Sequence, residues 1–269
     1  MKETISFGES SSELASGNSI SVQLFNKVPE VTLFFWIIKI MATTVGETAA
    51  DFLSSTLKLG LVNTSYVMGG LLVVALLIQF KLKRYIPISY WLVVVLVSVV
   101  GTLITDNLVD NLHVSLVTTT AVFSIALATV FALWYGSEKT LSIHSIYSAK
   151  RELFYWATIL LTFALGTAAG DLVAEYFGLG YAVSGLIFSA IIAVITLAYF
   201  QFKLNAVLAF WMAYILTRPF GASIGDLLSQ PVSAGGLGLG TVGTSSVFLM
   251  AIIILITYLT IQQKKQIPI

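Results

Sequence analysis

The sequence repeats one short pattern four times along its length. In each copy an aromatic residue and a tryptophan are followed, after nine residues, by a glycine and, after four more, by an aspartate. The copies are Phe35-Trp36 with Gly46 and Asp51, Tyr90-Trp91 with Gly101 and Asp106, Tyr155-Trp156 with Gly166 and Asp171, and Phe210-Trp211 with Gly221 and Asp226. A tandem pattern with constant internal spacing predicts one structural unit built four times, with neighbouring units packed on one another.

The composition indicates the solvent in which these units fold. Of the 269 residues, 57% are hydrophobic and only 10% are charged, whereas a soluble chain carries roughly 25% charged residues. Too few charges remain to cover a water-exposed surface, so we expect an integral membrane protein whose main partner is the lipid bilayer. The formal charge of +1 excludes the basic surface of a nucleic-acid-binding protein.

Eight apolar stretches are each long enough to cross a hydrocarbon core of about 30 Å as a helix of about 20 residues. Four stretches carry the repeated pattern and contain charged residues, near 31–57, 88–110, 153–175 and 208–229. The stretches that follow them contain none, near 62–80, 114–135, 181–202 and 242–262. The sequence therefore predicts an all-α polytopic membrane protein with eight transmembrane helices. Each repeat crosses twice, so the four repeats are parallel and enter from the same side.

The spans divide the chain into a membrane domain and two tails. A serine-rich segment without an apolar run, residues 1–29, is expected to be a mobile soluble tail. The membrane domain covers residues 30–263 and contains repeats at about 30–83, 85–137, 150–203 and 205–263. Residues 264–269 form a short C-terminal tail. The first apolar run begins only at Val31, so no cleavable signal peptide is expected.

The positive charges predict the orientation of the bundle. Most lysines and arginines lie in the connections after the uncharged spans or in the C-terminal tail: Lys81, Lys83, Arg84, Lys139, Lys150, Arg151, Lys203, Lys264 and Lys265. The connections at the opposite end contain only Lys58. Because cytoplasmic loops are enriched in lysine and arginine, both termini are predicted to be cytoplasmic.

With these features the chain resembles a bacterial family of uncharacterised membrane-anchored proteins. That family has four tandem repeats, each with two transmembrane regions and a characteristic tryptophan. The resemblance covers residues 27–263, and the matching tryptophans are Trp36, Trp91, Trp156 and Trp211. It implies a location in the bacterial cytoplasmic membrane and supplies no biochemical activity. Anchoring at the cytoplasmic interface is the simplest interpretation of the four tryptophans.

The repeated glycines predict how the charged spans pack. Gly46, Gly101, Gly166 and Gly221 are each followed four residues later by another small residue or threonine. Small residues one turn apart allow membrane helices to approach closely, because lipid provides no hydrophobic drive for association. We therefore expect the four charged spans to pack on one another as an inner ring.

Polar residues spaced four apart lie on one face of each charged span. In the first repeat this face contains Lys39, Thr43, Glu47 and Asp51, and the equivalent faces contain Thr102 with Asp106, Thr167 with Asp171, and Asp226. Two interpretations are open: each aspartate caps or terminates its helix near the outer surface, or the faces converge on a shared site. Convergence predicts a cation site formed by Glu47, Asp51, Asp106, Asp171 and Asp226, with the threonine hydroxyls beside it and with Lys39 and Arg218 as charge partners.

The last repeat differs from the others at Arg218-Pro219. A proline inside a helix removes a backbone hydrogen bond, so we expect a kink or break at this point. Arg218 lies at a depth that permits an ion pair with Glu47, which would join the first and last repeats. Such a pair could serve a site or act only as a structural latch.

The chain contains no cysteine, and its two histidines lie far apart in the predicted topology. These facts exclude thiolate sites and provide no support for a catalytic zinc site. No GxSxG or HExxH motif is present, so we do not expect an enzyme or a bound cofactor.

The buried charges favour a membrane transporter or exporter of a small cation, because ionisable residues inside membranes usually serve function. Coupling of this transport to protons is left open by the sequence. Oxygen ligands favour hard ions, and Mn²⁺ is the divalent cation preferred by analogy. The alternatives are a carrier of a small organic solute, with Lys39 and Arg218 binding an anionic group, and a non-transporting membrane scaffold or sensor. The formation of a homo-oligomer is left open by the sequence.

Overall fold

The computed structural model describes residues 26–266, and within this range it contains eight helices that are long and apolar enough to cross a membrane and no β-strand. Four helices carry the repeated pattern: α2 (Leu33–Asp51), α4 (Pro87–Asp106), α6 (Ala149–Asp171) and α8 (Ala206–Ser229). Four follow them: α3 (Gly60–Lys81), α5 (Leu116–Glu138), α7 (Gly180–Phe202) and α9 (Gly240–Gln266). The predicted all-α fold of four two-helix repeats is confirmed.

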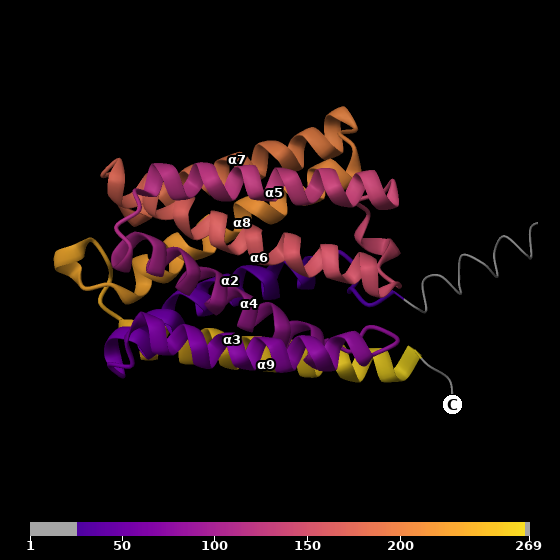
Figure 1. The fold of residues 1–269 in the computed structure, drawn as a ribbon, viewed down its shortest axis with the longest axis horizontal. Coiled ribbons are helices and arrows are strands. Elements are labelled where there is room, and N and C mark those ends of the chain that lie inside the picture. Colours follow the sequence, from indigo (N-terminus) through magenta and orange to yellow (C-terminus); the bar gives the residue numbers. More distant parts are fainter. Residues whose placement is uncertain (1–25, 267–269) are drawn as a thin grey trace, which may run out of the picture.

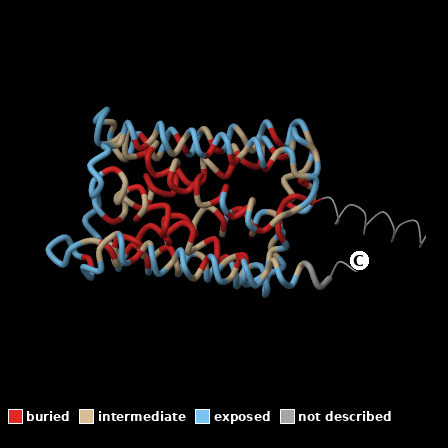
Figure 2. Tube along the Cα trace, turned by 90° about the horizontal axis from the view of Figure 1, so that it is seen from below, coloured by how far each residue is buried: buried red, intermediate tan, exposed pale blue. Residues whose placement is uncertain are grey.

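The pattern-bearing helices form an inner ring, as the glycines predicted. α2 packs on α4, α4 on α6, α6 on α8, and α8 again on α2. These four spans are 56–67% buried, whereas the other four are 17–22% buried. Figure 1 shows the inner helices between α5 and α7 on one side and α3 and α9 on the other, and Figure 2 shows the buried residues concentrated inside. The mostly exposed helices therefore form an outer shell.

Each outer helix packs mainly on the inner helix of the next repeat. α3 packs on α4, α5 on α6 and α7 on α8, and α9 of the last repeat closes on α2 of the first. This arrangement interlocks successive repeats, because every outer helix bridges from its own repeat to its neighbour. Thr48 on α2 and Ser245 on α9 meet at this closure, with their hydroxyl oxygens 2.6 Å apart.

The repeat glycines lie where neighbouring inner helices approach most closely. A Cβ atom added to Gly46 would overlap the side chain of Ser98, and one added to Gly101 would lie 2.6 Å from Cβ of Phe163. The remaining contacts continue around the ring, from Gly166 to Arg218 and from Gly221 to Thr43. Each glycine thus meets the same repeat position of the next inner helix.

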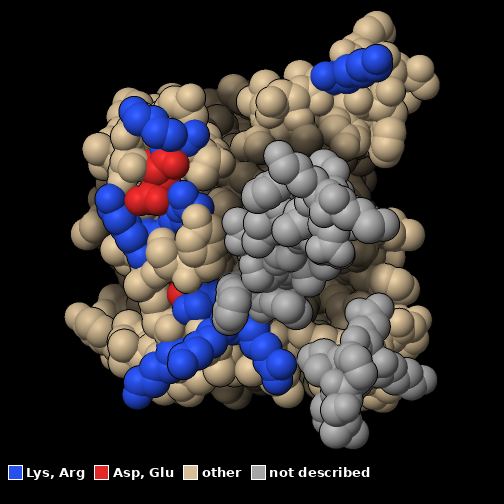
Figure 3. Space-filling model, turned by 90° about the vertical axis from the view of Figure 1, so that its right-hand side faces the viewer, with Lys and Arg blue, Asp and Glu red and all other residues tan. Residues whose placement is uncertain are grey.

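The two ends of the bundle differ in charge, and we name them accordingly. The basic end comprises residue 26, the end of α9 and the connections α3–α4, α5–α6 and α7–α8. Figure 3 shows lysines and arginines gathered on this face. The acidic end comprises the other connections and the repeat aspartates. At this end a π-helical segment directly follows the aspartate in three repeats, at Phe52–Thr56, Asn107–Asn111 and Leu172–Tyr176.

The helix of the fourth repeat is continuous, so the break expected at Pro219 is not observed. α8 extends as an α-helix from Ala206 to Ser229 with Pro219 inside it. The proline ring lies against Gly166 of α6, since a Cβ on that glycine would be 3.0 Å from Cδ of the proline. A proline deprives the helix of one hydrogen bond, and this loss is accommodated here without interrupting the helix.

Residues that were expected to belong to a mobile tail are packed against the basic end. Residues 1–25 and 267–269 lie outside the described residues, but Asn26 and Lys27 are buried. The backbone of Asn26 accepts a hydrogen bond from the amide of Tyr85 at 3.0 Å. The ammonium of Lys27 lies 2.6 Å from the carboxylate of Glu152 on α6. The membrane domain therefore begins before residue 30, and α9 extends beyond the predicted boundary at 263.

The repeat tryptophans belong to an aromatic layer inside the basic end. Trp91, Trp156 and Trp211 are at most 4% exposed, so interfacial anchoring is wrong for these three. Only Trp36 is partly exposed among the four. Tyr90 and Tyr155 directly precede the tryptophans of the second and third repeats. Their hydroxyls share a hydrogen bond of 2.5 Å.

The close approach at Gly101 leads to a stability prediction. Gly101→Ala should lower the free energy of unfolding by about 1–3 kcal/mol, because the added methyl overpacks the contact with Phe163. Gly70→Ala is the matched control, since nothing lies within 4 Å of a Cβ at Gly70 on α3. The control should be neutral or slightly stabilising because alanine favours helix. Thermal unfolding in detergent measures both, and equal stability of the two variants would contradict the close-packed ring.

Candidate functional site

The polar residues of the inner helices form layers that repeat every four residues. The outermost layer, at the acidic end, contains Asp51, Asp106, Asp171 and Asp226. One turn deeper the same helices provide Glu47, Thr102, Thr167 and Ala222. The next layer contains Thr43, Ser98, Phe163 and Arg218, and the deepest contains Lys39, Val94, Ile159 and Tyr214. The four-residue spacing places each series on one face of its helix.

Arg218 joins all four inner helices through one nitrogen atom. Its side chain is fully buried, and Nη2 lies 2.7 Å from Oε2 of Glu47 on α2. The same nitrogen donates hydrogen bonds to the hydroxyls of Thr102 on α4 and Thr167 on α6, the latter at 2.7 Å. Thr102 also donates to Glu47 at 3.3 Å. The ion pair expected between the first and last repeats is therefore present, and two of the three predicted threonines belong to it.

The third threonine lies elsewhere. Thr43 donates a hydrogen bond of 2.6 Å to the carbonyl of Ile40 and occupies the close contact of α2 with Gly221. Thr43 therefore belongs to the contact between α2 and α8, and among the described residues no hydrogen bond joins its hydroxyl to Arg218.

The burial of Arg218 is only partly compensated. Nε and Nη1 have no hydrogen-bond partner among residues 26–266, and neither does the buried hydroxyl of Ser98 in the same layer. A buried donor without a partner costs about 1–3 kcal/mol. The layer is therefore a costly arrangement for packing alone, because an apolar set of side chains would avoid these losses.

Lys39 is the second buried cation of the ring. Its ammonium donates to the carbonyl of Tyr214 at 2.9 Å and to the hydroxyl of Thr217 at 2.5 Å, both on α8. It also lies 4.3 Å from the centre of the Tyr214 ring and 5.2 Å from that of Phe163. None of the ion pairs among the described residues involves Lys39, so aromatic faces and neutral oxygens stabilise its charge.

The repeat aspartates do not act as helix caps. Asp51, Asp106 and Asp171 stand at the start of their π-helical segments without a side-chain capping hydrogen bond. Asp51 accepts one hydrogen bond of 3.3 Å, from Gln230 of the last repeat. The carboxyl groups of Asp106, Asp171 and Asp226 accept none within residues 26–266. A side-chain cap is therefore wrong for the first three copies, although the α-helical part does end at each of these aspartates.

The four aspartates share one electrostatic environment. Each of them interacts electrostatically with Glu47, and Asp226 interacts with Asp171 and Asp51 as well. Asp226 is 7% exposed, and the other three are partly exposed. Glu47 and the four aspartates therefore lie near one another at the acidic end, and we name these five residues the acidic cluster.

The predicted metal site, in contrast, is not preformed. In the described part of the chain, no group of three or more His, Cys, Asp or Glu side chains is arranged to hold a metal ion. This corrects the expectation that Glu47, Asp51, Asp106, Asp171 and Asp226 bind one ion together. The physical reason is that Arg218 engages Glu47 while each aspartate is held on a different helix.

Three residues of the site were missed by sequence reasoning. Tyr214 and Thr217 hold Lys39, and the ring of Phe163 lies between the two cations, 5.6 Å from the guanidinium carbon of Arg218. A layer-by-layer comparison of the repeats would have identified Phe163 and Tyr214, because they occupy the positions of Arg218 and Lys39 in other repeats. Thr217 lies outside these layers and had no signal in the sequence.

Comparison with known proteins places the repeats in a family. The family model described as Repeat of Unknown Function (DUF347) matches four consecutive segments, residues 34–85, 89–140, 154–204 and 209–265. The chain belongs to this family, since the segments cover most of its length. No curated protein and no solved structure gave a significant match. The functional interpretation therefore depends on the chain's own residues.

The ion pair at the centre leads to a second prediction. Arg218→Met should lower the free energy of unfolding by about 3–5 kcal/mol, because it leaves the Glu47 carboxylate buried without its cation. Adding Glu47→Gln to that variant should recover a large part of the loss, because the remaining groups are neutral. Chemical denaturation of both single variants and the double variant measures the coupling. Strictly additive losses would contradict the assignment of Arg218 as the partner of Glu47.

Proposed function

We propose that the chain is a membrane transporter of a small cation and that the acidic cluster is where the cation binds. The observation that supports this most is that Asp106, Asp171 and Asp226 lie inside the ring yet accept no hydrogen bond from the described residues. Carboxylates inside a membrane domain are costly unless they are compensated. Groups that serve neither as caps nor in ion pairs are available to bind a proton or a cation.

The central arginine serves in this proposal as the gate. A cation that enters from the acidic end meets the Glu47–Arg218 pair, which joins all four inner helices. Passage requires that pair to separate. Proton coupling would follow from competition between a proton and the transported cation for the repeat aspartates.

Beyond the gate the path is closed in this conformation. Lys39 adds a second buried positive charge, which repels a cation, and Tyr90 and Tyr155 close the aromatic layer. A transport cycle therefore requires the inner helices to move. The unpartnered nitrogens of Arg218 supply donors that can form new hydrogen bonds after such a movement.

The chemistry of the ligands limits the cargo to hard cations. Carboxylate and hydroxyl oxygens suit H⁺, Na⁺, Mg²⁺, Ca²⁺ or Mn²⁺ better than copper. A divalent ion would have to draw two or more carboxylates together, because they are not grouped around one point here. A monovalent cation or a proton requires less rearrangement, and Mn²⁺ stays a candidate to be tested beside them.

The same proposal includes the location of the protein. We place it in the bacterial cytoplasmic membrane with the basic end in the cytoplasm, on the charge bias of the connections. The acidic cluster would then face the outside. A cysteine introduced at exposed Ser233 should react with an impermeant maleimide in intact cells, and a failure to react before lysis would reverse this orientation.

One observation supports a different cargo. Lys39 is fully buried and pairs with no carboxylate among the described residues. An organic anion could use such an ammonium as its partner, so a carrier of a small organic solute is the second candidate. In that case transport would depend on Lys39 more than on the aspartates.

Flux through purified protein in sealed proteoliposomes tests the proposal. Asp106→Asn and Asp171→Asn should fold normally and lower cation flux at least about tenfold, a factor that corresponds to 1.4 kcal/mol. Asp110→Asn is the matched control, because this exposed aspartate lies one turn beyond Asp106. It should retain most of the flux.

Three outcomes would contradict cation transport. The first is that vesicles with the wild-type protein show no flux of H⁺, Na⁺, Mg²⁺, Ca²⁺ or Mn²⁺. The two asparagine variants could lose thermal stability without a separate loss of flux, which would make the aspartates structural and favour a scaffold or sensor. Solute flux that is abolished by Lys39→Met, but not by Asp106→Asn, would favour the organic-solute carrier.

A further inference from the structure

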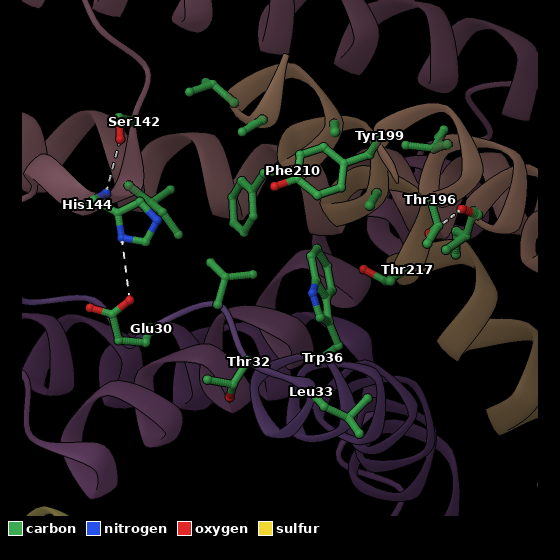
Figure 4. Close-up of a pocket in the computed structure, with 18 of the residues that line it drawn as sticks. Glu30, Thr32, Leu33, Trp36, Ser142, His144, Thr196, Tyr199, Phe210 and Thr217 are labelled. Carbon is green, nitrogen blue, oxygen red and sulfur yellow. Dashed lines mark hydrogen bonds and ion pairs between the residues drawn. The ribbon is translucent and has the colours of Figure 1, made fainter. Parts of the chain in front are cut away.

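A cavity of about 740 Å³ lies at the basic end between α2, α7 and α8. Most of its wall is apolar and aromatic and includes Trp36, Ile195, Phe200 and Phe210. Figure 4 shows Glu30, Ser142 and His144 together at one end and Thr196 and Thr217 at the other. This volume falls within the range of about 300–1,000 Å³ that is typical of small-molecule sites.

Two outer helices differ at the positions that border this cavity. Where α7 has Thr196 and Tyr199, the equivalent positions of α5 hold Phe131 and Trp134. Those two rings pack on Trp211, with centroids 5.1 and 5.8 Å from it. The position of Thr196 and Phe131 is occupied by Leu76 in α3 and by Ile256 in α9.

The repeat tryptophan beside this cavity is partly exposed. Trp36 borders the cavity and is the one repeat tryptophan that is not buried. The three other tryptophans are at most 4% exposed. The cavity therefore lies beside the one repeat tryptophan that is partly exposed.

The wall and the two ends of the cavity indicate the class of ligand. Tyr199 and Phe200 on α7 are 41% and 72% exposed on the outer surface of the bundle, so the cavity borders the region where lipid would lie. An aliphatic chain suits the apolar wall. At the polar end the carboxylate of Glu30 lies 3.9 Å from Nδ1 of His144. A head group that forms hydrogen bonds without adding charge disturbs this pair least.

We propose that this cavity binds a single-chain amphipathic molecule with an uncharged, hydroxyl-bearing head group, taken from the bilayer. The chain lies against Trp36 and Phe210, and the head lies beside Glu30, Ser142 and His144. Monoacylglycerols have this chemistry. The inner end of the cavity is Thr217, whose hydroxyl accepts a hydrogen bond from Lys39. Thr217 directly precedes Arg218, so the cavity reaches the polar layers of the inner ring. Binding of a ligand in the cavity does not depend on cation transport.

Photocrosslinking to the full chain in nanodiscs tests this site. The probe is a monoacylglycerol with a diazirine in its chain, and the labelled residues are identified by peptide mass spectrometry. We expect adducts on Trp36, Phe210 and their neighbours in α2 and α8. Thr196→Phe, which copies Phe131 of the second repeat, should reduce these adducts at least about tenfold, the factor that corresponds to 1.4 kcal/mol.

The matched control is Thr129→Phe on α5. Thr129 is exposed and donates to the carbonyl four residues earlier at 2.8 Å, as Thr196 does. It lies outside the cavity, so its replacement should leave the adducts unchanged. Thr196→Leu, the residue of the first repeat, serves as a second filling variant if the phenylalanine variant does not fold.

Two results would overturn the proposal. Labelling spread evenly over the exposed outer helices, and equal in all variants, would show contact with bulk lipid only. Equal or stronger labelling of the cavity by a diazirine fatty acid, with its anionic carboxylate, would overturn the assignment of an uncharged head group.

Discussion

The structure depends on the contact of one arginine nitrogen with three helices at once. Nη2 of Arg218 binds Glu47, Thr102 and Thr167, so it connects its own helix to each of the others in the inner ring. In a membrane, helices gain little from apolar contact because lipid is equally apolar. Close packing at the glycines and satisfaction of buried polar groups must then hold the ring together. Close packing and polar satisfaction occur together in the layer of Arg218, since Gly166 packs on the side chain of this arginine.

The four repeats supply a symmetric frame, and their differences supply the chemistry. Each repeat glycine contacts the same repeat position of the next inner helix, and each outer helix packs mainly on the inner helix of the next repeat. Within this frame only the first repeat has Lys39 and Glu47, and only the last has Arg218. The charges therefore meet where the ring closes between the first and last repeats. The apolar cavity lies at this same closure, beside Trp36 and α8.

Much of this arrangement followed from the sequence because it depends on spacing. A period of four residues places Glu47, Thr102 and Thr167 at equivalent depths, and the small residues predict an inner ring. The packing of outer helices on the next repeat could not be predicted, since a two-helix repeat is compatible with either neighbour. Pro219 shows a different limit: the break expected there is not observed, and the fit of its ring against Gly166 depends on tertiary packing. The burial of Trp91, Trp156 and Trp211 likewise depends on neighbours that the sequence does not reveal.

The closure of the ring is the central claim, and a disulfide between its first and last repeats tests it most directly. The chain has no cysteine, so Thr48→Cys with Ser245→Cys gives a single designed pair at the contact of α2 with α9. We predict an intramolecular disulfide under mild oxidation in membranes, because the native oxygens are 2.6 Å apart. Thr48→Cys with Thr257→Cys is the control, since Thr257 lies on the exposed face of α9. A pair at 48 and 245 that stays reduced, or that links only separate chains, would contradict the closed ring.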